Sequence, residues 1–474
     1  MINISAAMPA IEFTGEDVSN TNRRMLAETE PLALRTFTPS QAVLARSAGV
    51  FHWTPEGRRL YDYTSGVLVA NLGHNPIRWT QRLLAYMGWN RLPGEASPAA
   101  RGGYFAAVPL TAYNALTEVE AQATQRLVAS LQRSAFGHQL QQVMWAASGS
   151  EAVQKALWAA LHRDEQRDLI IATRFGFHGK KGLAGAVTGS EKDRDRDPRV
   201  KFISFPMAEC ADHLLTEFDP APYELELQQL WNQYGQRLNC LITEPYLGGG
   251  GSYHPPHAYL QLLQRWCREH DILFILDEVQ ANFGRTGEMY AFEAYGVEPD
   301  FVCLGKGLGN GVPVSAAVGR KDVMSHLRYG EASDTWSANP LGCAAVLATL
   351  DEFETTDVLA HTRALTPVFL AGLDRLRETG LIARVRGEGL VFGIECQPSG
   401  NLTAPEVAAA IVRAAYLGEA GGDGIHLLGP LAGKVIRISP PMTMTFAEAE
   451  DSLNLLLRVT SQLSESLLGQ PVTN

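Results

Sequence analysis

Long hydrophobic runs are missing from this 474-residue sequence. A helix that spans a bilayer needs roughly 18 to 20 consecutive apolar residues, and no stretch of the chain approaches that length. The N-terminal segment MINISAAMPAIEF lacks a basic start followed by an apolar core, which is the pattern of a secretion signal. We therefore expect a cytoplasmic protein that does not enter a membrane.

Clusters of basic residues, paired cysteines and metal-binding histidine spacings are also lacking. Lys and Arg are scattered and the net charge is -11, which argues against a nucleic-acid-binding protein. The six cysteines are dispersed without a CxxC pair, so we expect reduced thiols. His254 and His257 are separated by two prolines, which cannot hold them on one helical face. No metal site is expected.

The sequence has no GxxxxGK[ST] phosphate-binding loop and no internal repeat. From about residue 143 to 317, short apolar runs alternate with helical patterns, which is typical of βαβ units around a mostly parallel sheet. The chain is too long for one ordinary core. We predict an α/β fold with three parts: an N-terminal arm and hairpin segment (1–80), a large domain whose mostly parallel sheet is flanked by helices (81–344), and a small α+β domain (345–474).

Two predicted strands end at, or just before, a residue with a reactive side chain. The apolar run 272–276 stops at Asp277, and the run 301–304 stops at a glycine followed by Lys306. Ligands of open α/β sheets bind at the carboxyl ends of the strands, so both side chains would reach one edge. A lysine that forms a Schiff base and a carboxylate that keeps a pyridine nitrogen protonated are what pyridoxal phosphate (PLP) requires. A solvated lysine and a helix-capping aspartate would give the same pattern.

A helix N-terminus is predicted just after residue 148. Ser148 and Glu151 form a capping box, which places the start of a helix at this turn. The free N–H groups and the helix dipole there would hold a phosphate group. Gly149 would let the backbone come close, and the Ser150 hydroxyl would add a hydrogen bond. An ordinary well-capped helix would show the same residues.

Several short motifs occur in one order along the chain: SGSEA, FHG, EP followed by glycines, DEVQ, GRTG, GKG and NPLGCAA. In this order they resemble the class III PLP-dependent aminotransferases, the family of the ornithine, 4-aminobutyrate and ω-amine:pyruvate enzymes. The resemblance covers roughly residues 40–450. It implies PLP fold type I, a homodimer with shared active sites, and transfer of an amino group from a primary amine or amino acid to a 2-oxo acid (pyruvate or 2-oxoglutarate).

The resemblance also implies roles for single residues. Lys306 would be the Schiff-base lysine and then the proton carrier, and Asp277 would pair with the pyridine nitrogen. Burial and the positive ring would lower the pKa of Lys306 enough for it to act as a base. The other implied cofactor contacts surround the ring or the phosphate: Gly149 and Ser150 at the phosphate, Phe177 and Val279 on the two ring faces, His178 and Glu244 beside the cofactor, Gln280 near the phenolic oxygen, and Thr335 at the phosphate of the other subunit.

The implied substrate residues depart from the family pattern. Arg437 aligns with the arginine that binds the substrate α-carboxylate. Gly249 stands where many 2-oxoglutarate-dependent members have a glutamate that pairs with this arginine, and Leu247 stands at a glutamine position. Lys180 replaces an arginine that clamps a distal carboxylate; it offers a point charge, and it either binds an anionic group or is only solvated. Tyr113 is expected to line the pocket.

These departures leave other reactions open. Class III members include lyases that act on amino-phosphates or amino-phosphonates, and racemases. An elimination would release ammonia without a 2-oxo acid acceptor. A non-catalytic binding protein on the same fold is a third hypothesis, against which the intact Lys306 and Asp277 argue. The sequence alone does not name the donor, the acceptor or the stereochemistry.

Overall fold

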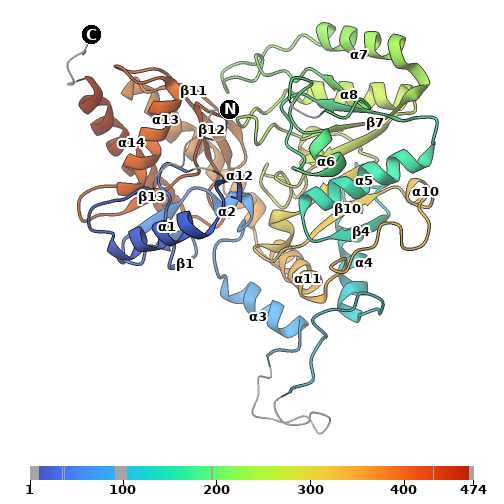
Figure 1. Ribbon diagram of the computed structural model, residues 1–474, viewed down its shortest axis with the longest axis horizontal. Coiled ribbons are helices and arrows are strands. Elements are labelled where there is room, and N and C mark those ends of the chain that lie inside the picture. Colours follow the sequence, from blue (N-terminus) through green and yellow to red (C-terminus); the bar gives the residue numbers. More distant parts are fainter. Residues whose placement is uncertain are drawn as a thin grey trace.

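The computed structural model describes residues 10–34, 36, 38–90, 104–193, 196–430 and 432–468. Figure 1 shows two halves: the N-terminal elements lie among the C-terminal ones in one half, and the middle of the chain forms the other. Residues 1–9 of the predicted arm and residues 469–474 of the predicted small domain lie outside the described residues.

Helices occur in every part of the described chain, from the N-terminal to the C-terminal end. The longer ones are α1 (Asp17–Thr29), α3 (Ile77–Tyr86), α4 (Glu118–Gln132), α5 (Gly149–Arg163), α7 (Ala221–Tyr234), α8 (His257–Glu269), α11 (Pro340–Thr355), α12 (Val358–Asp374), α13 (Ala404–Leu417) and α14 (Phe446–Leu468). The short ones are α2 (Ser65–Leu68), α6 (Gly182–Ala186), α9 (Ala291–Tyr295) and α10 (Lys321–Met324), with 3-10 turns at Leu32–Leu34, Gly235–Arg237, Lys306–Gly309 and Arg375–Thr379. In the described residues, no helix is both long and apolar enough to cross a bilayer.

The strands form three sheets. The large sheet has the order β4-β10-β9-β8-β7-β5-β6, and the two smaller sheets have the orders β1-β2-β3-β13 and β11-β12-β14. The strands are β1 (Arg46–Ala48), β2 (Phe51–Trp53), β3 (Arg59–Asp62), β4 (Gln142–Ala146), β5 (Leu169–Thr173), β6 (Val200–Ile203), β7 (Leu238–Thr243), β8 (Leu273–Asp277), β9 (Phe301–Leu304), β10 (Ser315–Gly319), β11 (Ile382–Glu388), β12 (Val391–Cys396), β13 (Gly424–His426) and β14 (Val435–Ile438).

The large sheet is mostly parallel, as the sequence predicted. Strands β6, β5, β7, β8 and β9 run parallel, and β10 pairs antiparallel with both β9 and β4. Both faces are covered, because alternate residues of β8 join different cores: Ile275 packs in the cluster that contains α5, and Phe274 in the cluster that contains α8. This double burial explains the unbroken apolar runs that predicted β8 and β9. The predicted α/β class is confirmed.

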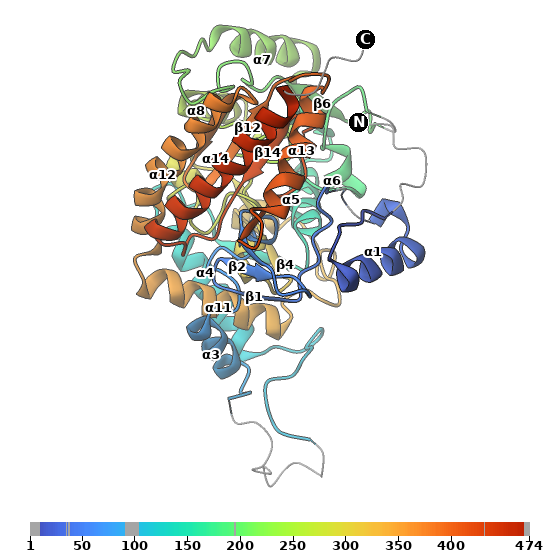
Figure 2. The ribbon, with the colours of Figure 1, turned by 90° about the vertical axis from the view of Figure 1, so that its left-hand side faces the viewer.

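The N-terminal strands share a sheet with the C-terminal part of the chain. β13 pairs in parallel with β3, so the predicted hairpin of β2 and β3 is built into the half that also holds β11, β12 and β14. Figure 2 shows α12, α14 and α13 side by side on the outside of this half, and α14 contacts both of the others. The exact residues at which the predicted domains meet stay a prediction.

Candidate active site

A cavity of about 370 Å³ opens at the carboxyl ends of the parallel strands, the edge that the sequence predicted. Residues that follow β4, β5, β7, β8 and β9 line it. Most of the predicted cofactor residues are among them: Gly149, Ser150, Phe177, His178, Glu244, Asp277, Val279, Gln280 and Lys306. The fold therefore brings nine of the positions predicted from the motifs together at one cavity. In the sequence these positions are spread over about 160 residues, which is about the length of one domain.

Lys306 has an unusual backbone and an unusual charge environment. Its φ of 47° lies in the left-handed region, which is uncommon for non-glycine residues. The pKa of its amine is lowered to about 8, because burial disfavours the charged form and the Arg437 guanidinium adds a second positive charge. The carboxylates of Asp277 and Glu244 oppose this shift. A lysine of this kind can be neutral, and hence nucleophilic or basic, near physiological pH.

In the chain without ligand, the Lys306 amine should react with an acylating reagent at lower pH than an exposed lysine does. Half of the Lys306 amines are neutral at about pH 8, whereas a solvated lysine reaches that point at about pH 10.4. Mass spectrometry of labelled peptides over a pH series measures both profiles, with the exposed Lys321 as the internal control. Identical profiles for the two lysines would contradict the charge environment described here.

Asp277 is held in place by His178. The Nδ1 atom of His178 lies 2.7 Å from Oδ2 of Asp277, and the backbone N–H of Val279 donates to Oδ1 over 3.1 Å. Both side chains are almost completely buried, and Nε2 of His178 has no hydrogen-bond partner. A buried carboxylate with fixed orientation thus faces the same cavity as the Lys306 amine.

Glu244 joins two loops at the cavity. Its Oε1 atom accepts a hydrogen bond from the backbone N–H of Phe177 (2.9 Å) and its Oε2 from that of Gly248 (3.2 Å). Burial and the nearby Asp277 carboxylate raise the pKa of Glu244 to about 7, although His178 and the two N–H donors oppose this. Glu244 therefore fixes the loop that carries Phe177, and its place beside the cofactor stays a prediction.

The N-terminus of α5 opens into the cavity with the predicted capping box. The Ser148 side chain accepts from the backbone of Glu151, and the Glu151 carboxylate accepts from the backbone of Ser148. A Cβ atom at Gly149 would lie 2.8 Å from Val279 Cγ1, so only glycine fits here. The free N–H groups of this first turn and the Ser150 hydroxyl face a space that suits an anionic group.

Arg437 lies next to the cavity on β14. Its Nη1 atom donates to Oε1 of Gln280 over 2.9 Å, while Nε and Nη2 have no partner although the residue is only 5% exposed. Burial lowers its pKa. Gly249 has no side chain that could pair with Arg437. Glu244, at the start of the same loop, opposes the pKa shift of Arg437 through its charge, while its oxygens accept from the backbone of Phe177 and Gly248. The two free nitrogens can take an anionic group.

Besides Arg437, three more predicted residues do not line the cavity in the single chain. Lys180 is exposed at the surface, Tyr113 is 57% exposed, and Thr335 is exposed on the loop before α11. Their predicted roles depend on surfaces beyond this chain and stay predictions. Conversely, Val69 and residues 311–314 line the cavity without having been singled out, because no motif marks them.

The family motifs also contain residues whose work is structural. Glu278 accepts hydrogen bonds from the backbone N–H groups of Ala291 and Phe292 at the start of α9, both 2.7 Å long. Arg285 is fully buried and donates to the carbonyl groups of Leu390 and Pro440. The DEVQ and GRTG motifs therefore join distant segments as well as supplying cavity residues.

Comparison with known proteins agrees with this geometry. The family model for class III aminotransferases matches residues 105–459. An acetylornithine aminotransferase of Agrobacterium fabrum is 30% identical over 442 residues, which cover 90% of the chain and 96% of that protein. A leucine/methionine racemase of Thermococcus litoralis is 27% identical over 462 residues, covering 92% and 93%. The solved structure of an (S)-enantioselective omega-transaminase from Thermomicrobium roseum matches with a TM-score of 0.76 at 23% identity, over 97% of this chain and 100% of that one, which shows the shared fold.

Proposed function

The chain belongs to the class III aminotransferase family, and on this premise we propose that its cavity moves an amino group from a primary amine or amino acid to a 2-oxo acid, pyruvate or 2-oxoglutarate. One observation carries the proposal: an amine whose pKa is lowered to about 8 and a buried carboxylate, Lys306 and Asp277, face the same cavity at the strand ends. The motif order and the family membership both support it.

The cofactor of the family is pyridoxal phosphate, and the residues of the cavity fit it. A Cβ atom at Gly149 would fill the space beside Val279, and the first turn of α5 offers unpaired N–H groups for a phosphate. When bound, the cofactor supplies an electron-withdrawing ring that makes the proton on the substrate's amine-bearing carbon acidic. Asp277 would hold the ring nitrogen in its protonated form, and His178 orients that carboxylate.

Lys306 has two tasks in this proposal. Its amine would hold the cofactor covalently between turnovers, and as a free amine it would serve as the base and acid that moves a proton at the substrate's amine-bearing carbon. Its lowered pKa leaves a large share of the free amine neutral near pH 8, which both tasks require. Phe177 and Val279 are the apolar residues that would cover the two faces of the ring, and a drier surrounding would strengthen the contact to Asp277.

Arg437 is the proposed receptor for the substrate carboxylate. Its unpartnered Nε and Nη2 atoms can receive a carboxylate as a fork, while Nη1 stays on Gln280. Because Gly249 brings no competing carboxylate, the receptor is available in both halves of the reaction. We propose that Lys180 and Tyr113, both exposed in the single chain, meet the distal part of the substrate at a subunit boundary.

A donor screen tests the proposed reaction. The purified enzyme is given a panel of primary amines and amino acids, each with pyruvate, with 2-oxoglutarate and with no acceptor. Transamination requires an acceptor for sustained turnover, and it forms one amino acid product for each donor consumed. Sustained turnover without acceptor would contradict the proposal.

The same acceptor-free reactions test the second candidate, a lyase or racemase of the same family. The glycine at position 249 and the racemase relative favour keeping this candidate. Ammonia released without a 2-oxo acid would identify a lyase, and inversion of a chiral amino acid without acceptor would identify a racemase. If neither appears while transamination proceeds, this candidate is excluded.

We propose that the enzyme works as a homodimer with shared active sites. Large apolar side chains are exposed on segments 104–116 and 329–339, with Trp336 59% exposed, and a hydrogen bond to the Leu110 carbonyl joins the two segments. Exposed apolar surface of this kind is typical of a protein interface. In the dimer, Thr335 would reach the phosphate in the partner's cavity. Light scattering after size-exclusion chromatography measures the mass and would contradict the proposal by giving that of one chain.

The proposed location is the cytoplasm and the proposed partners are small molecules. All six cysteines are buried free thiols, which is the usual state in a reducing compartment. The net charge of -11 and the scattered basic residues support the absence of a nucleic-acid partner.

The buried Lys155 should control how tightly the cofactor phosphate is held. Its Nζ atom donates to the Trp145 carbonyl (2.6 Å), to Asp334 Oδ2 (2.7 Å) and to Ser337 Oγ (2.8 Å), and so ties α5 to the loop of Thr335. Replacement of Lys155 by Met removes these bonds. Loss of a charged hydrogen bond costs about 1.5–3 kcal/mol, so we expect PLP to bind about 10- to 100-fold more weakly.

A PLP titration of the ligand-free variant, followed by absorbance, measures this effect. The control is the replacement Lys201→Met, because Lys201 lies outside the cavity and its Nζ donates only to the neighbouring Pro198 carbonyl among described hydrogen bonds. Equal PLP affinity in both variants would show that Lys155 does not act on the phosphate end.

A further inference from the structure

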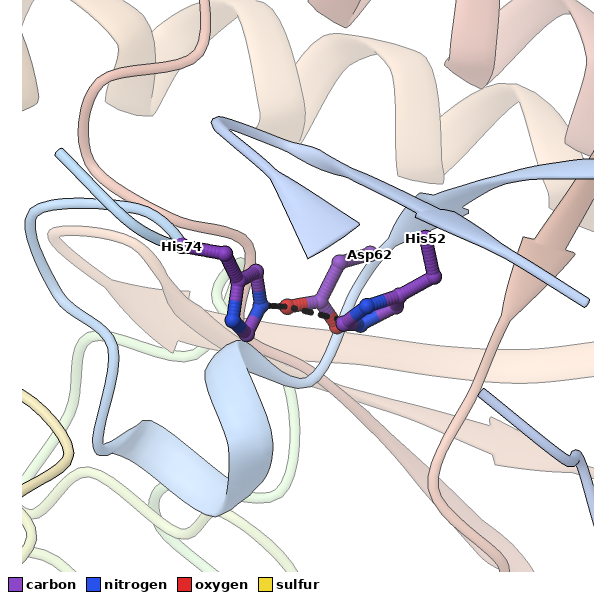
Figure 3. A group of neighbouring side chains, drawn as sticks. All are labelled: His52, Asp62 and His74. Carbon is purple, nitrogen blue, oxygen red and sulfur yellow. Dashed lines mark hydrogen bonds and ion pairs between the residues drawn. The ribbon is translucent and has the colours of Figure 1, made fainter. Parts of the chain in front are cut away.

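A second group of ionisable side chains, which could bind a metal ion, lies apart from the cavity. His52 lies on β2, Asp62 ends β3, and His74 lies in the loop that leads to α3. One potential ligand atom from each lies within 4.8 Å of the others, and no other described group of His, Cys, Asp or Glu has this spacing. Figure 3 shows both imidazole rings next to the Asp62 carboxylate, and the ring centroids of His52 and His74 lie 4.4 Å apart.

The strand pairing brings these residues together from separate places in the sequence. His52 pairs with Leu60 in the antiparallel ladder of β2 and β3, so Asp62, two residues further on, points to the same face as His52. Gly49 and His74 exchange two backbone hydrogen bonds of 2.9 Å, which place His74 beside the hairpin. The spacing of these three residues in the sequence does not predict that they lie together.

Neighbouring side chains hold the group in an orientation that suits metal ligands. Oδ1 of Asp62 accepts from the backbone N–H (2.7 Å) and the hydroxyl (2.8 Å) of Thr64. This leaves Oδ2 directed at Nε2 of His74 (2.7 Å) and Nε2 of His52 (3.5 Å). Ser47 Oγ lies 2.7 Å from Nδ1 of His52, and when Nδ1–H donates to it, the Nε2 lone pair faces Asp62.

The group is buried and leaves polar atoms without partners. Asp62 is fully buried and His52 is 2% exposed, and Nε2 of His52 has no hydrogen-bond partner. His426, which pairs with Asp62 across β3 and β13, places its ring edge-on to His52 and also has a buried, unpartnered Nδ1. Buried polar atoms normally find partners, and a cation between the rings and the carboxylate would provide one.

We propose that His52, Asp62 and His74 bind one divalent transition-metal ion, for which Zn²⁺ is the best fit. Two imidazole nitrogens and one carboxylate oxygen are ligands that Zn²⁺ prefers, whereas Ca²⁺ and Mg²⁺ prefer oxygen alone. The contacts of Ser47 and Thr64 are the supporting hydrogen bonds that such ligands usually have. A water molecule would complete four-fold coordination.

The proposed ion would fix both ends of the segment between Asp62 and His74. This segment carries Val69, which lines the cavity, and Asn71, whose Nδ2 donates to the Phe283 carbonyl over 2.9 Å. The ion is thus a structural one, and it stiffens one wall of the active site without touching the reacting groups. Binding to the folded state alone raises the unfolding temperature.

Metal content and titration test the proposal on the complete, PLP-loaded enzyme. The enzyme is stripped with a chelator, dialysed, and titrated with Zn²⁺ and, as a spectroscopic probe, with Co²⁺. We expect one ion per chain, visible absorption bands of Co²⁺ that Zn²⁺ displaces, and a higher unfolding temperature with metal. A wild-type enzyme that binds no ion at micromolar Zn²⁺ would overturn the proposal.

Variants locate the ion. His52→Gln removes one of three ligands, and we expect Zn²⁺ to bind at least about 100-fold more weakly, while the PLP absorbance stays unchanged. His138→Gln, at an exposed histidine far along the chain, is the matched control and should bind Zn²⁺ as the wild type does. If His52→Gln and the wild type hold the same amount of metal with the same affinity, the ion lies elsewhere and the proposal fails. The titration of the wild type keeps the test decisive even if a variant folds poorly.

Discussion

The variant Lys306→Ala should lose its PLP-derived visible absorbance and at least about a thousandfold of its turnover. A positioned proton carrier alone contributes about 10²- to 10⁴-fold, and here the covalent anchor of the cofactor is lost with it. The left-handed backbone at Lys306 and its lowered pKa, set by burial and by Arg437, single out this lysine for that work. Absorbance spectra and single-donor kinetics measure both losses.

The exposed Lys321 provides the control for this variant. Lys321→Ala removes a lysine of the same chain without touching the cavity, and it should keep the colour and the turnover of the wild type. Added methylamine should restore part of the activity of Lys306→Ala, because a small free amine can enter the space that the side chain leaves. Full turnover in Lys306→Ala would mean that another residue carries the cofactor.

The variant Asp277→Asn should bind PLP but turn over about 10²- to 10⁴-fold more slowly. An amide has no charge with which to hold a proton on the ring nitrogen, so the ring would withdraw electrons poorly. The hydrogen bond of 2.7 Å between Asp277 and His178 would also weaken, although the space stays filled. Rapid-mixing kinetics of the first half-reaction, with a single donor and no acceptor, measures the loss directly.

The neighbouring carboxylate separates this effect from simple destabilisation. Glu278 is equally buried, but its two oxygens accept from the start of α9 and do not line the cavity. Burial raises the pKa of Glu278 to about 8. Glu278→Gln should therefore lower the unfolding temperature and leave the turnover of the folded enzyme nearly unchanged. If both variants slowed the half-reaction equally, Asp277 would have no special role in it.

The placement of Asp277 and Lys306 at the strand ends could be predicted from the sequence because it depends on local patterns. β8 and β9 are buried on both faces, so they appear as unbroken apolar runs, and each run ends directly before a reactive residue. The capping box at Ser148 is equally local. Residues that follow such strands must lie at one edge of a parallel sheet, and for Asp277 and Lys306 this was enough.

The remaining contacts depend on which segments pair in space. Lys155 and Asp334 lie 179 residues apart in the sequence. No local pattern predicts their hydrogen bond, because segments so far apart meet only when a long loop closes. His52 and Asp62 meet only through the register of β2 and β3. The surface positions of Thr335 and Tyr113 in the single chain could not be predicted either, because no local pattern distinguishes them from residues that line a pocket.

Borohydride reduction followed by peptide mapping tests the central claim most directly. Borohydride converts a Schiff base between a lysine and PLP into a stable bond, so the cofactor stays on the residue that carried it. We predict that mass spectrometry will find one reduced cofactor per chain, on the peptide that contains Lys306. A label on any other lysine, or no label on a fully reconstituted enzyme, would contradict the account.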